Sequence, residues 1–354
     1  MKNLILSFVL MLSVSLSSVN ASAEIQNGFV TTADGRDIYV ETNLSSTTSQ
    51  RPLMIFVNGL VWKQEGYRQL MESVSSLGID SVSMSFSLHP ESLQNKNGFH
   101  QKVAAMKETS LDDLANEILT VVRKFRKPNQ KVIVTTLSYS GGVLPSVLKK
   151  SADLVDEGIA ISPLGVPGES DPASAAAGQT VELMLGLNPF AGPFLVGSLR
   201  QAYTENYITA ALRSRGPGFL PANVSLETAR SGLVRLVLAA DNFDLRKAVK
   251  NLPKNLHMIL GTGESEQRLS NQLEAFSIQR QQSNTAKLAL IPDAPHVTFA
   301  ESSKATAQML SLLTFAKLPT TTATFVYSER TESFASDDSE SHAELLQLVK
   351  KLKQ

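Results

Sequence analysis

The sequence predicts an α/β fold in which a mostly parallel sheet is flanked by helices, and three observations support this class. Short apolar runs typical of buried strands alternate along the chain with segments of helical period. The alternation lapses between about residues 163 and 244, where helix-like pieces are broken by Gly and Pro. It then resumes as far as about residue 317. We therefore expect one sheet domain that carries an inserted helical cap.

The first 23 residues are predicted to be a signal peptide rather than part of the fold. Lys2 supplies a positive charge, Leu4 to Leu16 form an apolar run, and Ala21-Ser22-Ala23 is a small-residue cleavage pattern. The apolar run is shorter than the roughly 20 residues that a membrane span needs. We expect cleavage after Ala23 and a periplasmic or secreted mature chain.

Local patterns predict the individual elements. Ser110, followed by two acidic residues, is a typical N-cap, and Met54 to Val57 is apolar throughout, as in a strand buried on both faces. The expected strands are 38–40 (antiparallel), 54–57, 80–86, 132–136, 158–162, 256–260 and 288–291. The expected helices are 66–77, 110–125, 143–150 and 297–313, with helical pieces at 181–187, 193–203 and 226–238 in the insertion.

These elements divide the chain into parts. Residues 1–23 are the signal peptide, 24–163 and 244–317 form the sheet domain, and 164–243 form the cap. Residues 318–354 are expected to be a polar linker and a short amphipathic helix.

The last helix is predicted from a capping box at Ser341 and Glu344, with apolar residues at helical spacing after it. We expect it either to dock on the core or to contact a partner or an anionic membrane surface. Truncation after Lys317 is expected to leave hydrolysis of a small ester intact.

The composition excludes several kinds of protein and site. Lys and Arg number 33 and Asp and Glu also number 33, so no bulk positive charge is available to hold nucleic acid. The absence of cysteine excludes disulfides, thiolate catalysis, cysteine-ligated zinc and iron–sulfur clusters.

The strongest chemical signal follows the strand at 132–136. The chain there reads Leu137-Ser138-Tyr139-Ser140-Gly141-Gly142 and then begins a helix. A Ser between a strand and a helix, with small residues two places before and after it, is the nucleophile-elbow pattern G-x-S-x-G. With Ser138 and Gly142 in the flanking places, Ser140 is the predicted nucleophile. A Ser- and Gly-rich turn without chemistry would have the same pattern.

A serine hydroxyl needs a general base to become a nucleophile, and the base needs an orienting carboxylate. His296 lies on the loop after the strand at 288–291 and is the predicted base. Glu264 follows the preceding strand, after the turn Gly261-Thr262-Gly263, and is the predicted acid. Glu266 is the alternative acid.

A more remote choice of acid is Glu169 or Asp171, in the loop after the strand at 158–162. The glycines of the turn before Glu264 do not indicate a dinucleotide site, because the third glycine of G-x-G-x-x-G is missing.

The order Ser140, Glu264, His296 is that of the α/β-hydrolases, and residues 28 to 316 resemble that superfamily with a helical cap. In this family the loop after the third strand usually reads His-Gly, and here Asn58-Gly59-Leu60 stands in its place. The resemblance implies an oxyanion hole made by the main-chain N–H groups of Leu60 and Gly141.

The chain departs from the family pattern at Asn58, at Ser138 in place of Gly, and at Glu264 where Asp is commoner. The resemblance, together with the expected signal peptide, implies an exported serine hydrolase that cleaves small or lipid-like carboxylic esters through an acyl-enzyme on Ser140. It implies no metal or organic cofactor. The alternative is a catalytically inactive relative that acts as a binding protein. The oligomeric state is left open.

The cap is expected to bear on the substrate class. Leu183 to Leu187, Pro189-Phe190 and Pro193 to Val196 concentrate large apolar groups. They either pack the cap on the core or line an acyl pocket over Ser140.

Overall fold

The computed structural model describes residues 24–46, 50–151, 153–166, 192–282 and 285–354, and for residues 192–199 only the backbone. The expected signal peptide, the helical piece at 181–187, Glu169 and Asp171 lie outside these ranges. In the described ranges, no helix combines the length and the hydropathy that crossing a membrane requires.

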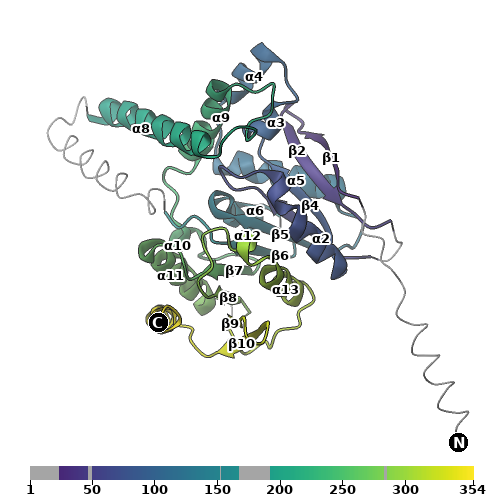
Figure 1. The fold of residues 1–354 in the computed structure, drawn as a ribbon, viewed down its shortest axis with the longest axis vertical. Coiled ribbons are helices and arrows are strands. Elements are labelled where there is room, and N and C mark those ends of the chain that lie inside the picture. Colours follow the sequence, from purple (N-terminus) through teal and green to yellow (C-terminus); the bar gives the residue numbers. More distant parts are fainter. Residues whose placement is uncertain (1–23, 47–49, 152, 167–191, 283–284) are drawn as a thin grey trace, which may run out of the picture.

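The described strands form one sheet of ten strands in the order β1-β2-β4-β3-β5-β6-β7-β8-β9-β10 (Figure 1). Pairing is parallel from β4 through β9 and antiparallel for β1 with β2, β2 with β4, and β9 with β10. The strands are β1 Gln26–Thr31, β2 Asp37–Asn43, β3 Leu53–Val57, β4 Asp80–Ser85, β5 Val132–Leu137, β6 Glu157–Ile161, β7 Leu256–Gly261, β8 Leu288–Ile291, β9 Thr324–Ser328 and β10 Ser333–Asp337. The predicted mostly parallel sheet is confirmed.

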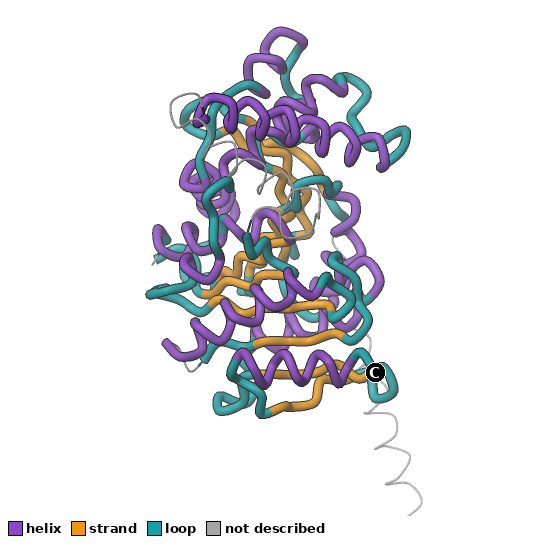
Figure 2. The backbone as a smooth tube through the Cα atoms, turned by 90° about the vertical axis from the view of Figure 1, so that its left-hand side faces the viewer, coloured by secondary structure: helices purple, strands orange, loops and turns teal. Residues whose placement is uncertain are grey.

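The helices separate and flank these strands (Figure 2). They are α2 Arg68–Ser76, α3 Pro90–Leu93, α4 Gly98–Ala105, α5 Leu111–Phe125, α6 Leu144–Lys150, α8 Gly192–Ser214, α9 Leu226–Ala239, α10 Leu245–Ala248, α11 Glu266–Gln282, α12 Thr298–Glu301, α13 Ser303–Thr314 and α14 His342–Leu352. Two 3-10 turns, η1 Gln64–Tyr67 and η2 Ser138–Gly142, stand after β3 and β5.

The two faces of the sheet carry separate apolar layers because successive strand side chains point to opposite faces. In β3, Met54 and Phe56 pack with α2 and α13, whereas Leu53, Ile55 and Val57 belong to the layer under α5, α6 and α11. Each expected strand and helix of the sheet domain is present with small differences at its ends, except that the helix expected at 297–313 is divided into α12 and α13 at Ser302. Ser110 caps α5 as expected, and the cap is a capping box completed by Asp113.

The described part of the insertion between β6 and β7 consists of α8, α9 and the short helix α10 (Figure 1). Helix α8 packs on α9, and α9 packs on α4 and α3. The buried Tyr139 ties α9 to the turn after β5, since its hydroxyl donates to the carbonyl of Leu236. The helical character expected for 193–203 and 226–238 is confirmed.

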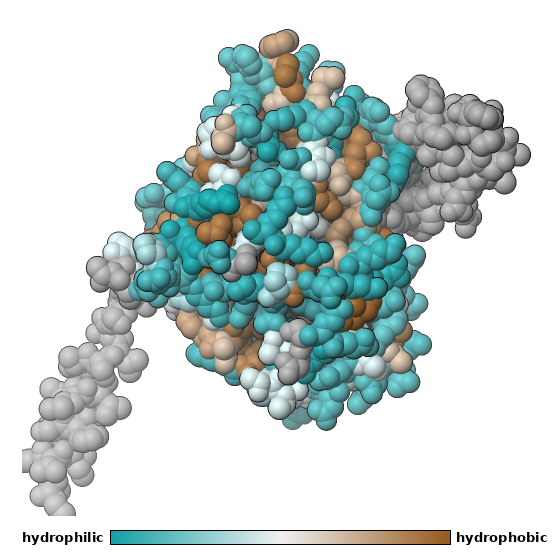
Figure 3. All heavy atoms as spheres, turned by 180° about the vertical axis from the view of Figure 1, so that it is seen from behind, coloured by the Kyte–Doolittle hydropathy of each residue, from teal (hydrophilic) through white to brown (hydrophobic). Residues whose placement is uncertain are grey.

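The surface is largely hydrophilic in the view of Figure 3, with apolar groups that gather at the end where α4 lies. The exposed apolar side chains on this helix and directly after it are Phe99, Val103 and Met106.

The tail after Lys317 differs from the expected polar linker, because β9 and β10 extend the central sheet beyond β8. The sequence of this tail is polar because β10 and the outer half of β9 are half-buried or exposed, and a polar sequence predicts a linker rather than strands. Lys287 holds the connection to β9, since its ammonium donates to the carbonyls of Pro319 (2.6 Å), Thr320 (3.0 Å) and Thr322 (2.5 Å). The capping box at Ser341 is present, and α14 docks on α11 through the buried Leu345 and Val349.

Candidate active site

The turn after β5 holds Ser138 in an unusual backbone conformation. Its φ is 53°, in the left-handed region that residues other than glycine rarely adopt. Ser138 is the first residue of η2 and is partly exposed, whereas Ser140 is completely buried. Backbone strain at an exposed Ser between a strand and a helix is the hallmark of a nucleophile elbow.

The hydroxyl that meets His296 is that of Ser138. Its Oγ lies 2.7 Å from Nε2 of His296, and Nδ1 of the same ring lies 2.9 Å from Oε1 of Glu264. The expected pairing of Glu264 with His296 is therefore present in the geometry. The expected contact between Ser140 and His296 is not, and the candidate nucleophile is two residues earlier than the sequence pattern indicated.

Ser140 instead joins two strands beneath the turn. Its Oγ lies 3.0 Å from the carbonyl oxygen of Val57 at the end of β3 and 2.9 Å from that of Leu137, and it accepts from the N–H of Leu137. The Ser140 hydroxyl is therefore engaged by main-chain groups of Val57 and Leu137. In the observed register, Thr136 and Ser140 are the flanking residues two places from Ser138.

Glu264 is the carboxylate placed for the acid role, and its side chain is only 1% exposed. Burial acts to raise its pKa, but the hydrogen bond to His296 and the nearby Arg268 guanidinium outweigh burial, so the pKa lies below its ordinary value. Glu264 is therefore ionised at neutral pH. Glu266, the alternative, is an exposed residue at the start of α11.

Glycines bring the loops after β7 and β8 together. A Cβ built on Gly261 would lie 2.2 Å from the carbonyl oxygen of Ala294, and one on Gly263 would lie 2.8 Å from the same atom. The N–H of Gly263 donates to that oxygen at 3.0 Å. The absence of side chains thus lets the turn that carries Glu264 lie against the loop that carries His296.

No family model and no curated protein matches this sequence. Solved structures do match in fold. An alpha/beta hydrolase enzyme from a Medee basin deep-sea metagenome library has 13% identity and a TM-score of 0.54, over 82% of this chain and 98% of that one. A serine hydrolase involved in carbazole degradation has 13% identity and a TM-score of 0.54, over 83% and 100% of the two chains. The thioesterase domain from the curacin biosynthetic pathway has 13% identity and a TM-score of 0.51, over 83% and 99%.

The chain has the α/β-hydrolase fold. In that fold one oxyanion donor is the N–H of the residue directly after the nucleophile. Because Ser138 is the serine that contacts His296, the residue directly after the candidate nucleophile is Tyr139 rather than the expected Gly141. Gly141 has a packing role, because a Cβ built there would lie 2.5 Å from Cβ of Pro163.

The second expected donor, Leu60, lies on the loop after β3. Gly59 packs against Leu137, since a Cβ added to this glycine would lie only 3.3 Å from the Leu137 side chain and 3.5 Å from its carbonyl oxygen. The loop therefore runs beside the residue that precedes Ser138, which is where an α/β-hydrolase places its second oxyanion donor.

Asn58, which replaces the usual His of this fold, closes the same loop. Its Nδ2 donates to the carbonyl of Trp62 at 2.5 Å and to Oγ of Ser85 at 3.0 Å. Asn58 therefore supplies hydrogen bonds that fix the loop, although it is not the usual residue.

A residue that the sequence reasoning missed is Arg268, one helical turn after Glu264. Its Nη1 lies 2.8 Å from Nδ1 and 3.2 Å from Nε2 of His296, and 3.4 Å from Oε2 of Glu264. The available signal was the four-residue spacing from Glu264, which brings two side chains together where a helix begins.

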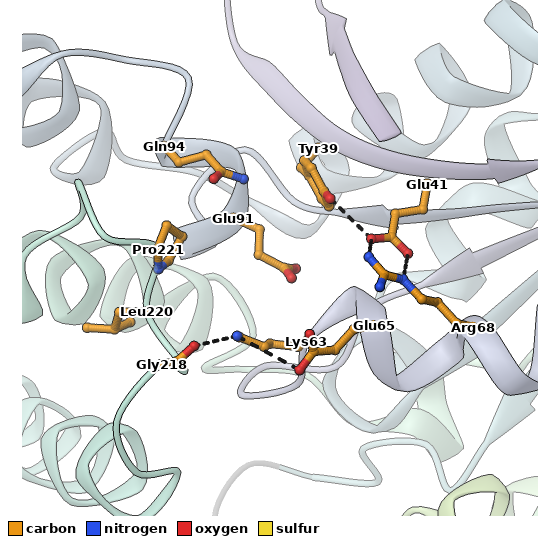
Figure 4. A pocket seen from close by; sticks show the side chains of 10 residues that line it. All are labelled: Tyr39, Glu41, Lys63, Glu65, Arg68, Glu91, Gln94, Gly218, Leu220 and Pro221. Carbon is orange, nitrogen blue, oxygen red and sulfur yellow. Dashed lines mark hydrogen bonds and ion pairs between the residues drawn. The ribbon is translucent and has the colours of Figure 1, made fainter. Parts of the chain in front are cut away.

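A separate polar cavity of about 190 Å³ opens between the sheet edge and the insertion, and the triad residues do not line it (Figure 4). Glu91 points into it, and burial raises the pKa of this carboxyl to about 7 against the hydrogen bonds from Ser85 and Gln64. Ser85 also bonds Asn58, so Glu91 belongs to the network behind the Asn58 loop.

Proposed function

We propose that this protein is a serine hydrolase that cleaves carboxylic esters through an acyl-enzyme on Ser138. The observation that carries the proposal is the continuous chain of hydrogen bonds from Ser138 through His296 to Glu264. The fold supports it, as do the names of two structural neighbours, a serine hydrolase and a thioesterase domain.

In the first half-reaction, Ser138 Oγ attacks the ester carbonyl carbon while its proton passes to Nε2 of His296. Glu264 accepts the Nδ1–H bond and stabilises the imidazolium. The negative oxygen of the tetrahedral intermediate is met by the N–H groups of Leu60 and Tyr139, each worth on the order of 3 kcal/mol in the barrier. The C–O bond then breaks, and the leaving alkoxide takes the proton from His296.

In the second half-reaction, His296 takes a proton from water, whose oxygen attacks the acyl carbon. The bond to Ser138 breaks, its oxygen regains the proton, and the carboxylic acid leaves. Neither half-reaction in this proposal uses a metal or an organic cofactor.

Labelling with a fluorophosphonate tests the proposal, because this reagent phosphonylates a serine that a neighbouring base activates. We expect the wild type and Ser140→Ala to be labelled and Ser138→Ala to remain unlabelled, with folding of each variant checked by circular dichroism. Label on Ser140, or none on the folded wild type, would contradict the proposal. The second outcome would favour the alternative, an inactive relative that acts as a binding protein.

We further propose that the enzyme works outside the cytoplasm after removal of residues 1–23. N-terminal sequencing of protein recovered from the periplasm or medium tests this, and the expected first residue is Glu24.

A further inference from the structure

Nη1 of Arg268 lies against the face of the His296 ring rather than in its plane. This atom is 2.8 Å and 3.2 Å from the two ring nitrogens, and in the ring plane an atom so placed would collide with the carbon between them. The in-plane positions of these nitrogens are already used by Glu264 and Ser138. Nη1 therefore contacts the face of the ring, with its N–H directed at the ring nitrogens.

This contact places a positive charge beside the catalytic centre. When His296 becomes an imidazolium, Glu264 and the oxyanion of the tetrahedral intermediate together balance the charges of His296 and Arg268. Lys353 supplies one further positive charge, the surplus, since its Nζ lies 3.5 Å from the carbonyl oxygen of Glu264. A neutral substrate leaves the surplus in place, whereas an anionic substrate offsets it.

Arg268 also has donors to offer. Within the described part of the chain, all its hydrogen-bond and ion-pair contacts are made by Nη1, and its Nε–H is buried without an acceptor. The Nε and Nη2 groups form the side of a guanidinium that binds a carboxylate through two parallel hydrogen bonds. The Arg268 side chain is 13% exposed beside a His296 side chain that is 32% exposed, so the guanidinium borders the accessible part of the site while its Nε is buried.

Resting on the proposed function, we propose that the substrate is an acidic ester, one that carries a carboxylate on its acyl or leaving group, and that Arg268 binds this carboxylate. The role is one of specificity: Arg268 holds the anion while Ser138, His296 and Glu264 carry out acyl transfer.

Two pairs of substrates test the inference. The mono-4-nitrophenyl ester of adipic acid and 4-nitrophenyl hexanoate share a six-carbon acyl chain and differ in a terminal carboxylate or methyl. The second pair, 4-acetoxybenzoate and its methyl ester, places the charge on the leaving group. We expect the wild type to favour the anionic member of at least one pair in kcat/KM by about tenfold or more, the worth of a charged hydrogen bond.

Arg268→Gln should lower that preference by about tenfold, mainly through KM, and Arg268→Lys should restore part of it, because an ammonium keeps the charge but not the fork of donors. Arg246→Gln is the matched control. Arg246 pairs with Asp244 and Glu274 on the insertion side of α11, so its loss should leave the preference unchanged.

Equal kcat/KM for both members of each pair in the wild type would overturn the inference. So would an Arg268→Gln variant that loses the same factor on both members, because that result would mark Arg268 as a support for the triad only. Fluorophosphonate labelling of the wild type separates this failure from failure of the proposed function. If Ser138 is labelled but the enzyme shows no preference for anionic substrates, only the acidic-ester inference is wrong.

Discussion

Ser138 combines an accessible hydroxyl with a backbone that only glycine occupies without cost. A left-handed residue with a side chain costs roughly 1–2 kcal/mol, and the hydrogen bonds of Ser140 and the packing of Gly141 on Pro163 hold the turn in place. The position of the proposed nucleophile is thus maintained at the expense of stability.

Replacing Ser138 with Gly should therefore give an inactive protein that is more stable than Ser138→Ala by about 1 kcal/mol. Denaturant unfolding of the two variants measures the difference. Ser73 in α2 is the control, because Gly is worse than Ala inside a helix and the order of stability should reverse there. An equal or lower stability for Ser138→Gly would argue against strain at this position.

The two serines also show why the sequence identified the motif but not its register. Small residues flank both Ser138 and Ser140 at two places on either side, with Thr136 serving in one register and Gly142 in the other. Only the end of β5 at Leu137 distinguishes them, and the ends of strands are the least reliable part of a sequence-based prediction. His296 had no such duplicate in its loop, whereas Glu264 had Glu266 two residues later; His296 and Glu264 are both placed as expected.

Glu91 should give the folded protein a distinct dependence on pH. Its folded pKa of about 7 exceeds the ordinary value of 4.5, so the folded state holds this proton more tightly than the unfolded state does. The stability that Glu91 contributes is complete below pH 4.5, falls as pH rises to about 7, and is constant above that.

In Glu91→Gln this dependence should vanish. We expect the variant to match the wild type in unfolding free energy near pH 4.5 and to exceed it by on the order of 3 kcal/mol above pH 7. Urea unfolding at pH 5 and pH 8 measures this, with Glu65→Gln, an exposed residue on the same cavity, as the control. A difference between the two proteins that is independent of pH would contradict the assignment.

At the scale of elements, the parallel strands and amphipathic helices were predictable because each has a local pattern. Apolar runs such as Met54 to Val57 and the N-cap at Ser110 each indicate one kind of element. β9 and β10 were missed because a strand near a sheet edge is stabilised by its neighbour rather than by its own apolar content. Arg268 was missed because its partners are 28 residues away or on the preceding turn.

The junction of the loops after β7 and β8 is the element on which the triad geometry depends. Gly261→Ala should push the Ala294 carbonyl away and displace His296, with a loss of activity on the order of 10²-fold, the usual consequence of a shift of about 1 Å. Ester hydrolysis and thermal unfolding measure the two effects separately. Gly28→Ala in β1, where a Cβ meets no atom within 4 Å, is the control and should retain activity. Full activity in Gly261→Ala would show that the loops adapt.

At the scale of the whole molecule, the tail belongs to the sheet, so the expectation for truncation after Lys317 is reversed. A chain that ends there lacks the partner of β8 and the carbonyls that satisfy Lys287. We now expect it to be insoluble or to unfold at a much lower temperature than the full chain.

Truncation after Glu340 is the matched comparison. It removes α14 but retains β9 and β10, so the protein should fold, with a stability lowered by about 1.5–3 kcal/mol for each buried apolar side chain lost from α14. Circular dichroism melts and hydrolysis of a small ester distinguish the two truncations. A stable and active chain ending at Lys317 would mean that β8 holds its place without β9.

The outer strands of the described sheet bear on aggregation. An edge strand presents unpaired N–H and C=O groups, onto which another unfolded chain can add a strand of its own. β10 covers β9 with the sequence Ser333-Phe334-Ala335-Ser336-Asp337, which is short and polar, and acidic residues follow it. β9 beneath it is more apolar, with buried Thr324 and Phe325. β10 therefore covers the more apolar strand β9 and forms an outer edge of its own. The carboxylates at and after the end of β10 repel the same edge of a second copy, which disfavours strand addition between chains.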